Sequence, residues 1–321
     1  MTAHGSSSSP RPRVVADGPL APAILELAAG SVDWLAWPSA GDGSIEPADA
    51  LYTYGHPTVD GRLLDRLPGL RVISNYGVGV DHIDLAAAKA RGIPVGNTPG
   101  VLDGATADMG FALLLAAARR LVEGDRYARS AQFTVYDPGY LLGREVHSSA
   151  LGIVGLGRIG YQLARRARAF DMRVLYCNRR RRPDVETELG VRHTSFDELL
   201  AQSDYVILSC PLTAETRGLM GAGSFSKMKS TAVLVNIARG GVVDTAALVT
   251  ALQKGQFAAA ALDVTDPEPL PRDHPLLSLA NVVIAPHLGS ATEQTRRRMT
   301  EMSIENLMAG LSGRPLPWRV G

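Results

Sequence analysis

Three polar side chains in the second half of the sequence stand just after apolar runs, and together they have the chemistry to reduce a ketone. They are Arg239, Glu268 and His287. Hydride transfer to a carbonyl carbon needs a proton donor at the oxygen, and histidine can serve near neutral pH. A carboxylate favours the protonated imidazole and fixes its tautomer, and an arginine binds carboxylate or carbonyl oxygens. A single histidine after a strand is more often a structural hydrogen-bonding residue, but the set of three predicts reduction of a 2-oxo acid.

A glycine-rich turn is the second chemical feature. Leu151–Gly160 reads LGIVGLGRIG, an apolar strand that runs into a helical pattern. Gly155 permits a tight turn, Gly157 lets the backbone approach a diphosphate, and Gly160 lets the helix pack on the strand. The N-terminus of that helix would face the diphosphate. The turn therefore predicts a dinucleotide site, although a glycine turn without a ligand would have the same pattern.

The residues after the next expected strand bear on which dinucleotide is bound. An acid that grips the ribose 2′-hydroxyl is usual about 20 residues beyond the turn, but here Asn178 is followed by Arg179 and Arg180. A carboxylate would repel a 2′-phosphate, whereas arginine binds phosphate with two parallel hydrogen bonds. The basic run continues to Arg182, so its arginines cannot all face one phosphate, and a solvated basic loop is the alternative. We expect NADP rather than NAD, bound by the first two arginines.

The elements that must position these residues form two series of alternating strands and helices, the pattern of parallel α/β units. In the first series we expect strands at Val14–Ala16, Ala50–Tyr54, Leu70–Asn75 and Pro94–Gly96, and helices at Pro19–Ala29, Val59–Asp65 and Leu85–Arg91. In the second we expect strands at Ala150–Val154, Arg173–Cys177, Tyr205–Ser209, Ala232–Ile237, Ala258–Val264 and Val282–Ala285. The expected helices are Arg158–Phe170, Phe196–Ala201, Asp244–Lys254 and Ala291–Leu311.

One more expected helix is apolar on nearly all sides. Asp103 is a plausible N-cap, and the run Ala107–Ala118 contains almost no polar residue. A helix without a polar face is buried, so we expect it to pack between two domains. The following stretch, Gly124–Gly143, is expected to be irregular.

Length, charge and cysteine content exclude several classes of protein. A chain of 321 residues suggests about two domains at roughly 150 residues each. Its net charge of +1 argues against partners such as nucleic acid or an anionic membrane. Two cysteines, Cys177 and Cys210, are too few for a disulfide framework or a cysteine-rich metal site, so we expect a cytoplasmic protein without a metal. The Ser-rich Met1–Pro10 is expected to be a disordered tail, with a transit peptide as the alternative.

Over about Leu51–Gly313 the chain resembles the D-isomer-specific 2-hydroxyacid dehydrogenase family. The motifs that carry the resemblance are Asn75–Asp84, Gly155–Gly160, Asn236–Asp244, Ala261–Pro271 and Pro286–Ser290. Within the family, the residues Leu262–Pro271, His274–Leu277 and His287–Thr292 are most similar to glyoxylate/hydroxypyruvate reductases.

The resemblance implies roles for the three catalytic candidates. His287 would be the acid/base, Glu268 its partner, and Arg239 the anchor of the substrate carbonyl and carboxylate. The family's substrate pocket is closed by an aromatic residue of the neighbouring subunit, usually tryptophan. Tyr140 stands nearest that position, which leaves the substrate preference open.

The resemblance also implies the remaining binding residues. The backbone amides of Val78 and Gly79 would hold the substrate carboxylate, and Ser290 would line its pocket. Asp263 would lie near the nicotinamide carboxamide. The residues expected around the cofactor are Thr106, Gly155, Gly157, Arg158, Ile159, Gly160, Asn178, Arg179, Arg180, Cys210, Pro211, Thr216, Ala238, Asp263 and Gly289.

The fold implied is a Rossmann cofactor domain, residues 100–289, inserted into a flavodoxin-like substrate domain, residues 1–99 and 290–321. Both would be doubly wound parallel sheets with the active site in the cleft, and the protein would be a homodimer. We expect an NADPH-preferring reductase of hydroxypyruvate and glyoxylate to D-2-hydroxy acids. The alternatives are a reductase of larger 2-oxo acids such as 2-ketogluconate, an NAD-dependent D-2-hydroxyacid dehydrogenase, and a non-catalytic dinucleotide sensor resembling corepressors.

Overall fold

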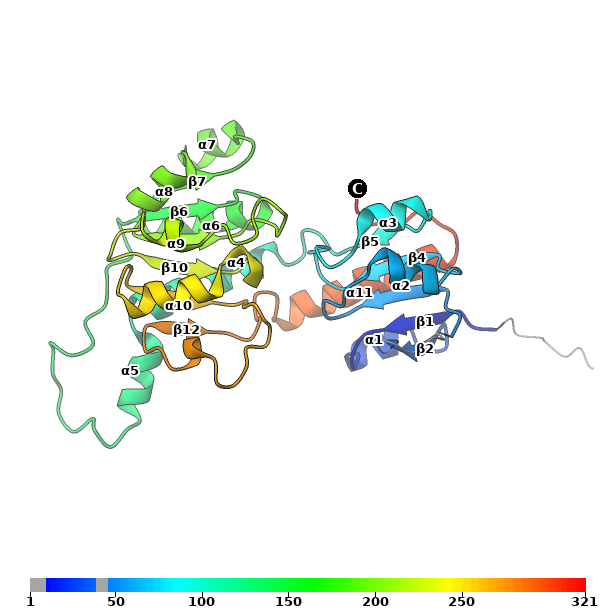
Figure 1. Ribbon diagram of the computed structural model, residues 1–321, viewed down its shortest axis with the longest axis horizontal. Helices are drawn as coiled ribbons and strands as arrows, with labels where there is room; N and C mark the ends of the chain where they lie inside the picture. Colours follow the sequence, from blue (N-terminus) through cyan, green and yellow to red (C-terminus); the bar gives the residue numbers. More distant parts are fainter. Residues whose placement is uncertain (1–9, 39–45) are drawn as a thin grey trace, which may run out of the picture. The chain divides into compact units, whose positions relative to one another are not determined.

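The computed structural model describes residues 10–38 and 46–321, which form two compact units (Figure 1). The first unit ends at Leu102 and resumes at Thr292, and the second contains Asp103–Ala291. The chain therefore leaves the first unit, completes the second and returns. The segment expected to be a terminal tail lies, apart from Pro10, outside the described residues.

The first unit is built on a five-stranded parallel sheet with strand order β2-β1-β3-β4-β5, which is the flavodoxin-like order. Its strands are β1 (Arg13–Ala16), β2 (Asp33–Ala36), β3 (Ala50–Thr53), β4 (Val72–Asn75) and β5 (Val95–Gly96). Its helices are α1 (Pro22–Leu27), α2 (Gly61–Arg66), α3 (Leu85–Ala90) and α11 (Glu293–Leu311). Every residue of β3 and β4 is buried, as is usual for parallel strands covered on both faces.

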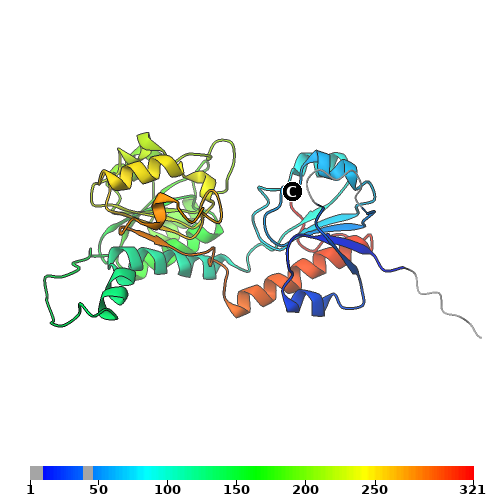
Figure 2. The same ribbon diagram turned by 60° about the horizontal axis from the view of Figure 1, so that its bottom comes forward.

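Buried contacts attach the C-terminal helix α11 to this sheet, and Figure 2 shows it running along the sheet in orange. The Tyr52 hydroxyl lies 2.7 Å from Ser303 Oγ, and Ser74 Oγ donates a 2.7 Å hydrogen bond to the Ser303 carbonyl. Gly310 lies so close to Val72 that a side chain at position 310 would overlap it. These contacts place the last helix in the first unit, although the second unit separates the two in sequence.

The second unit contains a seven-stranded parallel sheet with the order β12-β11-β10-β9-β6-β7-β8. The order changes direction between β6 and β9, as in a Rossmann sheet with one additional edge strand. Its strands are β6 (Ala150–Val154), β7 (Arg173–Cys177), β8 (Arg192–His193), β9 (Tyr205–Leu208), β10 (Val233–Asn236), β11 (Ala259–Leu262) and β12 (Val282–Ile284). Its helices are α4 (Asp103–Ala118), α5 (Leu121–Ala128), α6 (Arg158–Ala169), α7 (Pro183–Leu189), α8 (Phe196–Gln202), α9 (Ala222–Phe225) and α10 (Thr245–Gln253), with short 3₁₀ turns at η1 (Gly240–Val242) and η2 (Pro275–Leu277).

Side chains of the central strands alternate between two apolar cores. In β9, Tyr205 and Ile207 pack with residues of α4 and α6. Val206 and Leu208 pack with residues of α8 and α10. A strand buried on both faces reads as a continuous apolar run, and this is why most strands of the unit could be predicted.

The apolar helix α4 is largely buried, and the packing seen is within the second unit, whereas its sequence predicts a helix packed between two domains. It packs against α6, β10 and β11. Asp103 is the first residue of the helix rather than the residue before it. Arg120 has a φ of 51°, so the chain changes direction after α4 and continues as α5. Part of the stretch expected to be irregular is therefore helical.

Candidate active site

The glycine-rich turn joins β6 to α6, and its glycines fit the expected purposes. Gly155 has a φ of 101°, and a Cβ there would lie 2.7 Å from the Cys210 nitrogen. A Cβ on Gly160 would overlap the Gly155 carbonyl oxygen. A Cβ on Gly157 would meet no atom within 4 Å. Two of these glycines are required by the packing of the turn, and the third leaves open space at the N-terminus of α6 where a diphosphate can approach.

A cavity of about 1010 Å³ lies beside this turn, at the point where the strand order reverses. Ligands of doubly wound sheets bind at such a point. The predicted cofactor residues that line the cavity are Gly155, Gly157, Asn178, Arg179, Arg180, Cys210, Pro211 and Thr216. Ser209 and Glu215, which were not predicted from the sequence, also line it. Ser209 directly follows β9 and donates a 2.7 Å hydrogen bond to the Gly155 carbonyl, so its position at a strand end could have identified it.

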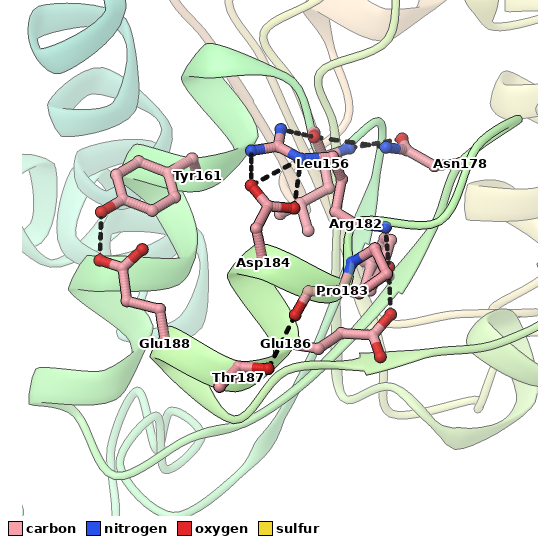
Figure 3. Close-up of polar contacts among 10 residues, drawn as sticks. Leu156, Tyr161, Asn178, Arg182, Pro183, Asp184, Glu186, Thr187 and Glu188 are labelled. Carbon is pink, nitrogen blue, oxygen red and sulfur yellow. Dashed lines mark hydrogen bonds and ion pairs between the residues drawn. The ribbon is translucent and has the colours of Figure 1, made fainter.

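Asn178 ties the end of β7 to the glycine-rich turn (Figure 3). Its Oδ1 accepts a 2.7 Å hydrogen bond from the Leu156 backbone N–H, and its Nδ2 donates a 3.3 Å bond to the Leu156 carbonyl. The residue that stands in place of the usual acid therefore carries no charge and holds the turn in place.

The four arginines that follow Asn178 divide into two pairs. Arg181 forms an ion pair with Glu186 and Arg182 with Asp184, at 2.6 and 2.7 Å. Arg179 and Arg180 are exposed, line the cavity and, within the part of the chain that the structure describes, make no ion pair. Arg182 lines the cavity as well, but its guanidinium is paired with Asp184, so Arg179 and Arg180 are the arginines best placed to bind an anion there.

The catalytic candidates follow three adjacent strands, β10, β11 and β12. The His287 Nδ1 lies 2.7 Å from Glu268 Oε1, so the carboxylate holds one of the two ring nitrogens. Arg239 follows β10, and its backbone is held by Asn236, whose Nδ2 donates a 3.0 Å hydrogen bond to the Arg239 carbonyl. Gly240 packs directly against Thr265, where a side chain would overlap the backbone. This close packing brings the turn that carries Arg239 against the loop that carries Glu268.

Asp263 has a role that the sequence analysis missed, because it shapes the loop that carries His287. The Asp263 side chain is buried at the end of β11. Its two carboxylate oxygens accept hydrogen bonds from the Leu288 and Gly289 backbone N–H groups, at 2.7 and 2.8 Å. His287, the residue directly before these two anchored positions, adopts a left-handed φ of 57°. Burial raises the pKa of the Asp263 carboxyl, and the two backbone N–H groups oppose that shift.

The other predicted cofactor residues of this unit lie outside the cavity lining. Arg158 Nε donates a 2.9 Å hydrogen bond to the mostly buried Asp103 carboxylate, which ties the N-terminus of α6 to that of α4. Thr106 lies beside Gly289: a Cβ added at Gly289 would be 3.3 Å from the methyl group of Thr106. The residues Ile159, Gly160, Ala238, Asp263 and Gly289 are buried or partly buried in the same unit.

In the first unit, Val78 and Gly79 belong to a loop after β4 that is held by its carbonyl groups. Asn75 Nδ2 donates to the Gly77 and Gly79 carbonyls, at 2.8 and 2.9 Å, and Asn97 Nδ2 donates to the Val78 carbonyl at 2.8 Å. In a trans peptide the N–H points opposite to the carbonyl. The N–H groups of Val78 and Gly79 therefore point away from the two asparagines, as a carboxylate-binding loop requires.

Tyr140 lies apart from the cavity, in the segment between α5 and β6. Its ring packs on that of Tyr127, with centroids 4.5 Å apart, and its side chain is 48% exposed.

Ser290 is partly buried at the end of the second unit.

Comparison with known proteins identifies the family. Residues 111–289, more than half of the chain, match the family described as D-isomer specific 2-hydroxyacid dehydrogenase, NAD binding domain. The chain belongs to this family. The glyoxylate reductase of Korarchaeum cryptofilum is 50% identical over 266 residues, which cover 83% of this chain and 80% of that protein. The glyoxylate reductase of Aeropyrum pernix is 45% identical over 318 residues, which cover 96% and 95%.

A similar solved structure is the NADPH-dependent glyoxylate/hydroxypyruvate reductase of Sinorhizobium meliloti in complex with NADP and malonate. It has a TM-score of 0.87 and 32% sequence identity, and the match covers 97% of each chain. The predicted family, the two doubly wound α/β domains and the enzyme class are thus confirmed. This 2-hydroxyacid dehydrogenase is an oxidoreductase that uses a nicotinamide dinucleotide cofactor.

The residues of the cavity fit such a cofactor. Gly157 leaves the N-terminus of α6 open to a diphosphate, and the Arg179 and Arg180 side chains add positive charge to the cavity lining. Among the described residues, no cluster of three or more His, Cys, Asp or Glu side chains is arranged to hold a metal ion. Over the same residues, no helix is long and apolar enough to span a membrane.

Proposed function

We propose that this enzyme is an NADPH-preferring reductase that converts hydroxypyruvate and glyoxylate to D-glycerate and glycolate. The observation that carries the proposal is the 2.7 Å contact between His287 and Glu268, at the same carboxyl end of the sheet as Arg239. The names of the relatives support the substrate class, since two of them at 50% and 45% identity are glyoxylate reductases.

The bound nicotinamide would supply the hydride that attacks the carbonyl carbon. Glu268 holds Nδ1 of His287, so Nε2 is the nitrogen that donates a proton to the carbonyl oxygen as the hydroxyl forms. Arg239 binds the substrate carboxylate and stabilises the negative charge that develops on the oxygen. The three polar side chains thus orient the substrate and supply the proton that accompanies the hydride, so that the carbonyl becomes a hydroxyl in a two-electron reduction.

The preference for NADPH rests on the charges in the cavity. A 2′-phosphate carries negative charge that an acid after β7 would repel, and here that position is the neutral Asn178. Arg179 and Arg180 line the cavity on the same side, and arginine binds phosphate through paired N–H donors. The relative from Sinorhizobium meliloti, described as NADPH-dependent, supports this assignment.

We also infer that the enzyme works as a homodimer. The segment between α5 and β6 exposes large apolar side chains, with Val135 70%, Tyr136 79% and Leu142 71% exposed. Several large apolar side chains exposed in one segment favour a contact with another protein surface. A second copy of the chain would cover it, and Tyr140 of that copy would be the aromatic residue at the substrate pocket. Light scattering of the purified protein would give twice the 34.1 kDa chain mass if this is correct, and the chain mass if it is not.

The proposal is tested by following NADPH absorbance with purified enzyme and hydroxypyruvate or glyoxylate, with parallel assays in NADH. Rapid loss of NADPH and slow loss of NADH would support both the substrate and the cofactor assignments. Equal rates would contradict the NADPH preference alone. Tight NADPH binding without turnover of either oxo acid, or of a larger one such as 2-ketogluconate, would favour a non-catalytic dinucleotide sensor.

A further inference from the structure

The cationic loop Asn178–Arg182, between β7 and α7, is held by a tyrosine at the end of the strand. The Tyr176 ring is buried, and its hydroxyl accepts a 2.7 Å hydrogen bond from the Arg182 backbone N–H. The same hydroxyl donates a 2.6 Å hydrogen bond to Glu186 Oε1 on α7. A tyrosine hydroxyl can donate and accept at once. One oxygen atom therefore joins the strand, the far end of the loop and the following helix.

Glu186 strengthens this anchor because it also binds Arg181. Arg181 Nε and Nη2 lie 2.8 and 2.6 Å from the Glu186 carboxylate oxygens. The Arg181 guanidinium, followed by the Tyr176 hydroxyl, lowers the pKa of Glu186 to about 2. Glu186 thus remains an anion at every pH at which the enzyme would be assayed, and Arg181 stays directed toward α7.

Arg182 closes the loop against the glycine-rich turn. Its Nε and Nη2 lie 3.0 and 2.7 Å from Asp184, and its Nη1 donates a 3.3 Å hydrogen bond to the Leu156 carbonyl (Figure 3). Leu156 is the residue that Asn178 also binds. Both ends of the loop are therefore fastened to the same turn. Of the three arginines between these attachments, Arg181 pairs with Glu186, and Arg179 and Arg180 line the cavity.

We propose that Tyr176, through its hydroxyl and Glu186, is a positioning residue for cofactor selectivity, because it fixes the loop in which Arg179 and Arg180 face the cavity. This inference rests on the proposed NADPH preference. A loop that is ordered before binding loses less conformational entropy when the phosphate arrives. Tyr176 itself would not touch the cofactor, and its effect would appear only in the recognition of the 2′-phosphate.

The test is the Tyr176→Phe variant, which removes one oxygen atom and keeps the buried ring. Tyr161→Phe is its matched control, since the Tyr161 hydroxyl also donates to a glutamate of α7, but to Glu188 rather than to Glu186, which binds Arg181 of the loop (Figure 3). Calorimetry would measure the dissociation constants of adenosine 2′,5′-bisphosphate and 5′-AMP, two probes that differ only in the 2′-phosphate. Neither measurement depends on catalysis.

We expect the wild type to bind the bisphosphate more tightly than 5′-AMP. In Tyr176→Phe that preference should fall about three- to tenfold, the scale of one hydrogen bond, with 5′-AMP binding unchanged. Tyr161→Phe should retain the full preference. An undiminished preference in Tyr176→Phe would overturn this inference and leave the NADPH assignment standing. An equal loss for both probes would also overturn it, since it would show a merely structural role. A wild type that does not distinguish the probes would overturn the NADPH preference as well.

Amide hydrogen exchange of the unliganded wild type gives a second test that needs no variant. The Arg182 N–H is expected to be protected before any nucleotide is added, because the Tyr176 hydroxyl accepts its hydrogen bond. Exchange at the rate of an open loop, with protection only after the bisphosphate binds, would show that the loop is not fixed in advance and would refute the inference.

Discussion

Replacing Asp263 by asparagine should separate the activity of this enzyme from its stability. The Asp263 carboxylate accepts two hydrogen bonds from the loop that holds His287 in a left-handed conformation. Hydrogen bonds to a charged group contribute about 1.5–3 kcal/mol each, so the pair contributes about 3–6 kcal/mol. The left-handed conformation of a non-glycine residue costs about 1–2 kcal/mol. The observed loop is therefore favoured by roughly 1–5 kcal/mol from these terms together.

Asparagine retains one oxygen acceptor and presents an N–H₂ group to the second backbone N–H. One neutral hydrogen bond of about 1 kcal/mol then roughly balances the conformational cost. At a balance between zero and about −1 kcal/mol, one half to about one sixth of the molecules keep His287 in place. We expect Asp263→Asn to lower kcat for hydroxypyruvate reduction about two- to sixfold by this route.

The difference in stability between this variant and the wild type should depend on pH, because Asp263 ionises and asparagine does not. Because the pKa of Asp263 is raised by burial, its contribution to stability is complete below the pKa of the unfolded chain. That contribution is lost as the pH rises through the folded pKa. Asparagine cannot ionise, so the midpoint of thermal unfolding of the variant, relative to the wild type, should be higher at pH 7 than at pH 4.

The assay combines steady-state kinetics with thermal unfolding at both pH values. Asp244→Asn is the control, because Asp244 is the N-cap of α10 and asparagine caps helices equally well. The control should keep the wild-type kcat and unfolding midpoint. A wild-type kcat in Asp263→Asn would refute the idea that the carboxylate positions His287.

The remaining predictions concern the catalytic histidine, the glycine-rich turn and a buried thiol. His287→Ala should lower turnover by roughly two to four decades, the scale of a positioned acid/base, with little change in NADPH affinity by fluorescence titration; unchanged turnover would remove His287 from the mechanism. Gly157→Ala should unfold at the wild-type temperature but bind NADPH more weakly, whereas Gly160→Ala should lose stability, because only the second Cβ meets backbone; the opposite order would contradict the packing described. Burial raises the pKa of the Cys210 thiol to about 11. Its alkylation by iodoacetamide should therefore be very slow at pH 7 and accelerate up to about pH 11. Bound NADPH should slow the alkylation further, because Cys210 lines the cavity. Rapid alkylation at pH 7, measured by mass spectrometry, would show that the thiol is not buried as described.

Much of the fold follows from local patterns in the sequence. Strands such as β9 are buried on both faces and read as continuous apolar runs. The edge strand β2 (Asp33–Ala36) was missed because it is half exposed and its four residues, DWLA, form no such run. Helix α7 was missed behind the basic loop, although Pro183 at its first position and Asp184 in its first turn are a recognisable helix start.

The site could be predicted less completely, because some of its residues act through tertiary contacts. The order of the strands brings the ends of β10, β11 and β12 together, so a strand-end search found Arg239 and His287. The way Asp263 shapes the loop of a neighbouring strand follows from no local pattern, since 25 residues separate it from Leu288. Similarly, the sequence did not show which arginines pair with acids of α7. The roles predicted for the individual site residues stay predictions until variants are measured.

The most direct test of the account is the identity of the product formed from hydroxypyruvate. Chiral chromatography after reaction with NADPH should show D-glycerate in an amount equal to the NADPH consumed, and almost none with His287→Ala. Formation of L-glycerate, or consumption of NADPH without glycerate, would contradict the proposed reduction by His287, Glu268 and Arg239.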